Sequence, residues 1–90
     1  MSKKLLVVED SRPIARVIKQ IAESLNYQVT LATCLAEVEA LLQGGENKFF
    51  AATIDYALPD ANDGEAISCV LSHGIPSIVM TGKMDEITRQ

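Results

Sequence analysis

Acidic residues follow two apolar segments of this 90-residue sequence, at positions where they could share a metal ion. Glu9 and Asp10 come directly after the run at residues 5–8, and Asp55 comes directly after an apolar run that begins at Phe49. An ionised carboxylate at the end of a buried strand is costly, and its pKa rises unless its charge is compensated. The placement therefore calls for a ligand that favours the charged carboxylates.

A divalent cation with a preference for oxygen resolves this conflict. Mg²⁺ binds through one or two carboxylates and completes its octahedral shell with water and phosphate oxygens. Glu9, Asp10 and Asp55 meet at one edge if the two apolar segments are neighbouring parallel strands. Thr81, at the end of a later apolar segment, adds a hydroxyl to the same edge. We therefore predict a magnesium site that also receives a phosphate group.

A simpler interpretation treats these acids as helix caps. Glu9 and Asp10 would then cap the helix that follows them, and Asp63 would cap a later helix. This interpretation leaves the shared position of Asp55 and Thr81 unexplained.

The elements that must position these residues alternate between short apolar runs and amphipathic stretches. The pattern predicts strands at residues 4–8, 28–32, 49–55 and 77–80. Three helices are predicted between them: one with Pro13 in its first turn, one capped by Thr33, and one over residues 63–72. Strands separated by such helices form a parallel sheet with right-handed crossovers. The sequence therefore predicts one α/β domain over residues 1–90, with a fourth helix beginning in the last eight residues.

Each predicted helix has one apolar face that we expect to pack on the sheet. The first face consists of Ile14, Val17, Ile18, Ile21 and Leu25. The second consists of Leu35, Val38, Leu41 and Leu42, and the third of Ala66, Ile67, Val70 and Leu71.

Composition and charge argue against several classes of protein. A net charge of −4 and a pI near 4.8 oppose direct nucleic-acid binding. No apolar run approaches the roughly 18 residues of a membrane span, and the first run is too short for a signal peptide, so we expect a cytoplasmic protein. Cys34, Cys69 and His73 have no metal-binding or redox spacing, which favours structural roles.

Other phosphate-binding motifs of open α/β sheets are missing from the sequence. The loop at residues 9–13 contains no glycine, which opposes a dinucleotide site, and there is no P-loop. A phosphate at this edge must therefore be held by a metal, a hydroxyl and backbone amides.

Three segments resemble the CheY-like receiver domains of two-component response regulators: LLVVED, ATIDYALPDANDG and PSIVMTG. They occur in the family's order and span nearly all 90 residues. The resemblance implies a flavodoxin-like, doubly wound parallel sheet of order 2-1-3-4. The fifth strand and fifth helix of the family are missing, so we expect a receiver domain that is incomplete at its C-terminus.

The resemblance also implies a role for individual residues in phosphoryl transfer. Asp55 would accept a phosphoryl group from a phosphohistidine on a sensor kinase or phosphotransfer protein. The Thr81 hydroxyl and the amides of Tyr56 and Gly82 would bond to phosphoryl oxygens. The chain would be a phosphoryl acceptor that assists its own phosphorylation and dephosphorylation rather than an enzyme.

The magnesium ligands implied by the resemblance come from both acidic segments. Asp10 and Asp55 would bind Mg²⁺ directly, Glu9 largely through water, and Ala57 through its backbone carbonyl.

Two features depart from the family pattern. The loop between Pro59 and Gly64 is one residue longer than the common form, which we expect to alter the loop locally. The lysine that follows the family's fifth strand is also missing, so phosphorylation is expected to be slow. We expect a C-terminal effector domain to be absent from this chain, and we expect residues 77–80 to form an apolar edge through which copies of the chain could associate.

Two alternatives to phosphorylation remain at this stage. The first is a receiver-like dimerisation or binding module that works without phosphate. The second is a metal-dependent hydrolase on a similar sheet, which Ala57 opposes because it stands where a general acid would be needed.

Overall fold

The protein folds around a four-stranded parallel sheet, which a computed structural model describes for residues 3–43, 49–56, 58–61 and 63–80. Its strands are β1 (Lys3–Val8), β2 (Tyr27–Ala32), β3 (Ala51–Asp55) and β4 (Ser77–Met80). They lie in the order β2-β1-β3-β4, and every neighbouring pair is parallel. The predicted flavodoxin-like sheet of order 2-1-3-4 is thereby confirmed.

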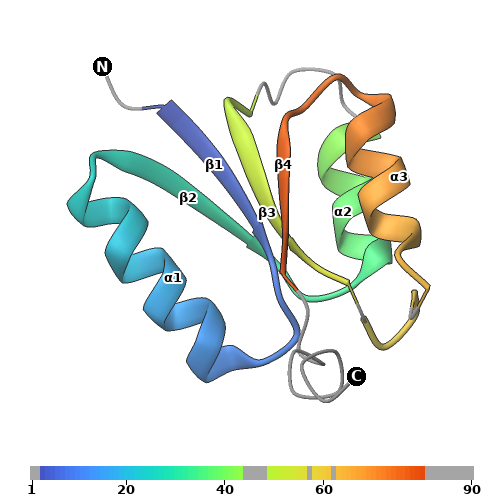
Figure 1. The fold of residues 1–90 in the computed structure, drawn as a ribbon, viewed down its shortest axis with the longest axis horizontal. Helices are drawn as coiled ribbons and strands as arrows, with labels where there is room; N and C mark the ends of the chain where they lie inside the picture. Colours follow the sequence, from blue (N-terminus) through green and yellow to red (C-terminus); the bar gives the residue numbers. More distant parts are fainter. Residues whose placement is uncertain (1–2, 44–48, 57, 62, 81–90) are drawn as a thin grey trace, which may run out of the picture.

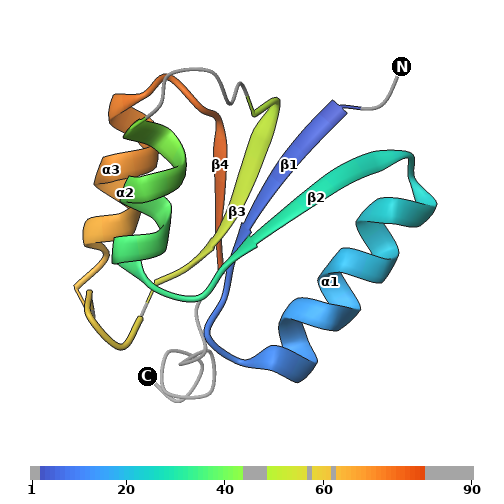
Figure 2. The same cartoon turned by 180° about the vertical axis from the view of Figure 1, so that it is seen from behind.

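In the part of the chain that the structure describes, three helices cover the two faces of this sheet (Figures 1 and 2). They are α1 (Arg12–Ser24), α2 (Leu35–Gln43) and α3 (Glu65–Ser72). Helix α1 lies on one face, whereas α2 and α3 lie side by side on the other. Pro13 falls in the first turn of α1, as predicted. The predicted fourth helix lies outside the described residues, and no described helix has the length and apolar character needed to cross a membrane.

The register between strands brings their carboxyl ends into line. Val8 at the end of β1 pairs with Ile54 of β3, and Asp55 pairs with Met80 of β4. The residues that follow β1 and those that end β3 therefore emerge at the same edge of the sheet.

The main core lies between the sheet and the helices α2 and α3. It contains fully buried branched residues, among them Leu6, Val8, Val38, Ile54 and Val70. On the α1 face a smaller cluster forms around Leu5, Val7 and Ala22. The central strand β1 is buried on both faces because its side chains alternate between these two clusters.

Helix α1 packs on the sheet differently from the prediction. It buries Ala15 and Ala22, whereas four of the five predicted face residues are exposed: Ile14, Val17, Ile21 and Leu25. Ile18 alone of the five is packed against the sheet cluster. The small alanines let the helix backbone approach β1 and β2. The helix is rotated about its axis relative to the prediction, so the larger side chains lie beside this contact rather than in it.

An apolar groove runs along this flank of α1. It has a volume of about 360 Å³ and is lined by side chains of α1 and the sheet, including Ile21, Leu25, Thr53 and Ile78. Ile21 is 57% exposed, Leu25 65% and Ile78 64%. A continuous exposed apolar surface of this kind favours association.

We expect substitution of Ile21 by glutamate to reduce self-association of the protein. The new charge would have to be buried whenever the α1 flank is covered by a second copy, and that burial is unfavourable. Light scattering at several protein concentrations measures the effect: wild type should gain mass with concentration, and Ile21→Glu should gain less. Gln20→Glu, which adds the same charge at an exposed neighbouring position, should behave as wild type. Equal masses for wild type and Ile21→Glu at every concentration would contradict the prediction.

Candidate functional site

The carboxylates of Glu9, Asp10 and Asp55 converge at the carboxyl edge of the sheet. One carboxylate oxygen from each lies within 4.8 Å of the others. Glu9 is 5% exposed and Asp55 8% exposed, whereas Asp10 is open to solvent. The predicted convergence of these three residues is therefore confirmed, and we call them the acid cluster.

Backbone hydrogen bonds hold the acid cluster in place. The Glu9 amide donates to the carbonyl of Ala32 at 2.9 Å, which extends the β1–β2 pairing by one residue. The Tyr56 amide donates to the carbonyl of Met80 at 2.8 Å and extends the β3–β4 pairing in the same way. The predicted contact between the Tyr56 amide and a phosphoryl oxygen would require this bond to be exchanged.

Burial and mutual repulsion perturb the ionisation of the cluster. The pKa of Glu9 is raised to about 7, chiefly because burial penalises its charged form, and the neighbouring carboxylates of Asp55 and Asp10 raise it further. The Ser11 amide opposes this shift by donating to the Glu9 carboxylate at 3.1 Å. Without a cation, Glu9 thus keeps its proton to a higher pH than an ordinary glutamate does.

The donor set suits a hard divalent cation. All three groups offer carboxylate oxygens, which Mg²⁺ and Ca²⁺ prefer over nitrogen and sulfur ligands. Three carboxylates at this separation also repel one another, and a bound cation removes that repulsion. The remaining predicted site residues, Ala57, Thr81 and Gly82, lie outside the described residues.

The fold matches that of solved receiver domains. The non-phosphorylated HemR receiver domain from Leptospira biflexa superposes with a TM-score of 0.77 at 26% identity, over 89% of this chain and 64% of that one. A CheY-like response regulator receiver domain protein from Methanospirillum hungatei JF-1 gives a TM-score of 0.77 at 31% identity, over 91% of this chain and 66% of that one. This chain has the fold of a CheY-like receiver domain.

Larger proteins contain the same fold as one of their parts. The response regulator PhyR from Brucella abortus matches with a TM-score of 0.74 at 29% identity, over 88% of this chain and 33% of that one. The chain spans less than two thirds of the length of each of these three structures. No protein-family model and no curated protein matches the sequence, so the assignment rests on the three-dimensional fold.

A loop residue of the receiver domain has a structural role that the sequence did not reveal. The carboxylate of Asp60 accepts hydrogen bonds from the amides of Leu35 at 2.7 Å and Ala36 at 3.1 Å. These amides open α2, so Asp60 caps that helix from a loop 24 and 25 residues away in sequence. Donation by the Leu35 amide, and secondarily by that of Ala36, lowers the pKa of Asp60.

The predicted cap at Thr33 is therefore wrong, and the simpler interpretation of Asp63 as a cap is wrong as well. Thr33 does not cap α2; instead its amide and hydroxyl donate to the Glu37 carboxylate at 2.6 and 2.7 Å. Asp63 does not cap α3, which begins after Gly64 in the left-handed region at φ +80°. The Asp63 amide donates to the Glu65 carboxylate at 2.9 Å. A side chain at position 64 would be strained by that φ, and its Cβ would lie 3.1 Å from the Tyr56 ring.

We expect Mg²⁺ to stabilise the receiver domain more at about pH 7.5 than at about pH 5.5. The folded-state pKa of Glu9 lies above its ordinary value of 4.5. The metal-free folded state therefore binds more protons than the unfolded state, and it loses stability as pH rises through this window. Mg²⁺ favours the ionised carboxylate and so restores more stability at the higher pH. Thermal melts with Mg²⁺ and with EDTA at both pH values measure the increment, which is the rise in melting temperature that Mg²⁺ causes.

Glu9→Gln provides the control for this experiment. The amide does not titrate, so the Mg²⁺ increment in this variant should depend less on pH. Equal increments at both pH values in wild type would show that Glu9 is not coupled to the metal.

Asp60→Asn should lower the melting temperature at neutral pH. A carboxylate whose folded-state pKa lies below its ordinary value of 3.8 stabilises the protein above that value, and the contribution is lost as pH falls below it. The difference between variant and wild type should therefore shrink in acid. Asp63→Asn is the matched control, because the amide of Asp63, rather than its carboxylate, makes the hydrogen bond with Glu65. A variant that melts like wild type at neutral pH would contradict the assigned role.

Proposed function

We propose that this receiver domain accepts a phosphoryl group on Asp55 from a phosphohistidine of a sensor kinase or phosphotransfer protein, with Mg²⁺ in the acid cluster. The observation that supports this function most directly is the convergence of three carboxylates within 4.8 Å at the end of a buried strand. Phosphoryl transfer depends on positioning and on neutralisation of charge. The paired strands would supply the positioning, and a bound cation would supply the neutralising charge.

In the proposed reaction, Asp55 is the nucleophile. One of its oxygens bonds to phosphorus while the bond from phosphorus to the imidazole nitrogen breaks, and the electron pair of that bond remains on the nitrogen. Strand β3 fixes the carboxylate through its pairing with β1 and β4, which reduces the entropic cost of alignment. Bound Mg²⁺ would supply positive charge for the ionised carboxylate and the phosphoryl oxygens.

The other predicted site residues would divide the remaining tasks. Glu9 and Asp10 would hold the cation, and the Ala57 carbonyl would add a further oxygen. The Thr81 hydroxyl and the Gly82 amide would bond to the phosphoryl group. The domain would work in the cytoplasm, and its output would pass to an effector.

A second candidate function is a binding module that pairs copies of the domain without phosphate. The exposed apolar flank of α1 and the edge strand β4, with Ile78 and Val79 open to solvent, favour this candidate. It predicts association that is independent of both Mg²⁺ and Asp55.

Incubation of the protein with acetyl phosphate and Mg²⁺ should add one phosphoryl group, detectable as a mass increase of the intact chain. Asp55→Asn should abolish the adduct because the amide is not a nucleophile of comparable strength, and EDTA should also prevent it. Asp63→Asn, which removes a carboxylate from the following loop, should still be modified. An adduct that persists in Asp55→Asn would refute the assignment, and its absence from wild type would favour the phosphate-independent module.

A further inference from the structure

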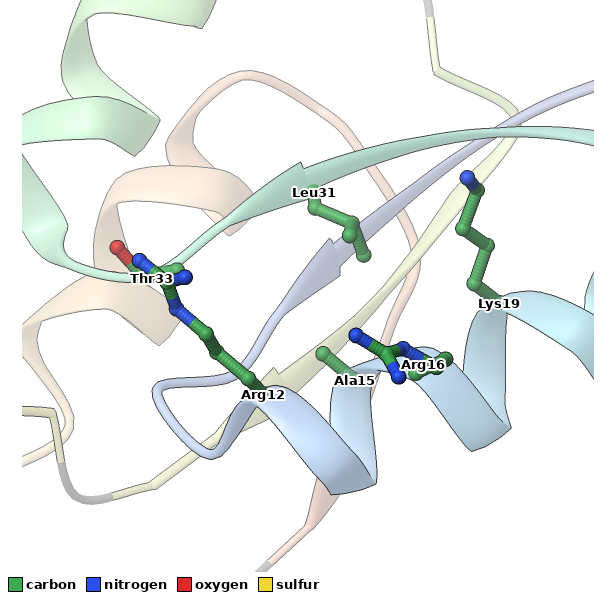
Figure 3. Close-up of a pocket in the computed structure, with 6 residues that line it drawn as sticks. All are labelled: Arg12, Ala15, Arg16, Lys19, Leu31 and Thr33. Carbon is green, nitrogen blue, oxygen red and sulfur yellow. The ribbon is translucent and has the colours of Figure 1, made fainter.

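A second polar site lies between α1 and β2, apart from the acid cluster (Figure 3). It is a groove of about 340 Å³, within the size range of small-ligand sites. Its lining comes from Arg12, Ala15, Arg16 and Lys19 of α1, and from Leu31 and Thr33 at the end of β2. Figure 3 shows the basic side chains leaving α1 on the side that faces β2.

The groove concentrates positive charge on an acidic protein. The chain has a net charge of −4, yet three of its eight lysine and arginine residues line this one cavity, and none of the acids that the structure describes does. Among the described residues, Lys19 forms an ion pair with Glu23 at 3.9 Å, whereas Arg12 and Arg16 form none. The two guanidinium groups therefore have hydrogen-bond donors available for an anion.

The spacing of these cations suits a short ligand with more than one anionic group. Arg12, Arg16 and Lys19 stand on successive turns of one helix, so the row extends roughly 10 Å along its axis. Acidic side chains lie near both ends of this row of cations. Glu23 forms an ion pair with Lys19, and the Glu37 carboxylate accepts a hydrogen bond from the Thr33 hydroxyl. A long acidic peptide would run past the cations toward these carboxylates, whereas a compact anion would not.

The groove also offers apolar contact beneath its charged rim. Ala15 is buried in its base, and Leu31 is 41% exposed toward it. Thr33 adds no free donor, since its hydroxyl already donates to Glu37. A ligand here would therefore combine anionic groups for the arginines with an apolar or aromatic part for Leu31.

We propose that this basic groove binds a small phosphate ester with two linked phosphates, of the nucleoside diphosphate class. Arginine presents a planar fork that bonds to phosphate oxygens in pairs, which makes Arg12 and Arg16 the principal contacts. Lys19 contributes a mobile point charge, and Leu31 contacts the nucleoside. The site is independent of the acid cluster, whose negative charge repels phosphate unless a cation is bound.

Calorimetric titration of the protein with ADP in the presence of EDTA tests this proposal. EDTA removes any metal from the acid cluster, so phosphate cannot bind there through a cation. We expect saturable binding of ADP at low salt, weaker binding of inorganic pyrophosphate and none of adenosine. Binding of ADP should weaken as salt is raised, because the contacts are exposed charges.

Variants locate the site. Arg16→Gln should weaken ADP binding by about tenfold, the loss expected for one charge-assisted contact. Lys4→Gln removes the same charge at the amino end of β1, outside the groove, and should bind as wild type. Leu31→Ala should weaken binding of ADP more than binding of pyrophosphate. The substituted side chains at positions 16 and 31 are exposed, and thermal melts check that the variants remain folded.

Three results would overturn the proposal. The first is an absence of saturable ADP binding to wild type at low salt. The second is equal weakening by Arg16→Gln and Lys4→Gln, which would indicate a diffuse charge effect. The third is Arg16-dependent binding of a polyglutamate peptide without binding of ADP, which would assign the groove to an acidic protein partner. Phosphorylation of Asp55 is measured separately with Mg²⁺, so failure of one proposal is distinguishable from failure of the other.

Discussion

The pairing of β1 with β3 is the constraint on which the functional edge depends. Because Val8 lies opposite Ile54, the next residues of the two strands, Glu9 and Asp55, are held at the same level of the sheet. Both strands are anchored by fully buried side chains, so the carboxylates cannot move apart to relieve their repulsion. The pKa of Glu9 is raised chiefly by its burial, and the neighbouring carboxylates raise it further. The paired strands thus hold three carboxylates close together, in an arrangement that could bind a divalent cation.

Much of this arrangement was predictable from the sequence because it follows from local patterns. The apolar run at residues 5–8 and the alternation of strands with helices specify a parallel sheet, and parallel strands place their carboxyl ends at one edge. The acids that follow these runs must then meet if the strands are neighbours. The resemblance to receiver domains supplied the strand order, and the structure agrees with it.

Other features were not predictable, because they depend on contacts between distant parts of the chain. The periodicity of α1 identified an apolar face but not the rotation by which Ala15 and Ala22, rather than Ile14 and Val17, meet the sheet. Local capping rules likewise selected Thr33 for α2, whereas the first amides of that helix are satisfied by Asp60. The sequence signal of a cap is a polar residue just before the helix, and Asp60 stands far outside that window.

The hydrogen bonds to the Asp60 carboxylate link two parts of the fold that are remote in sequence. The loop that follows the acid cluster is held against the start of α2 by the amides of Leu35 and Ala36. Those two amide protons are shielded from exchange with water only while the loop remains docked. The hydrogen-exchange rates of these two amides therefore report local opening of the loop next to Asp55, and they can be measured without an added label.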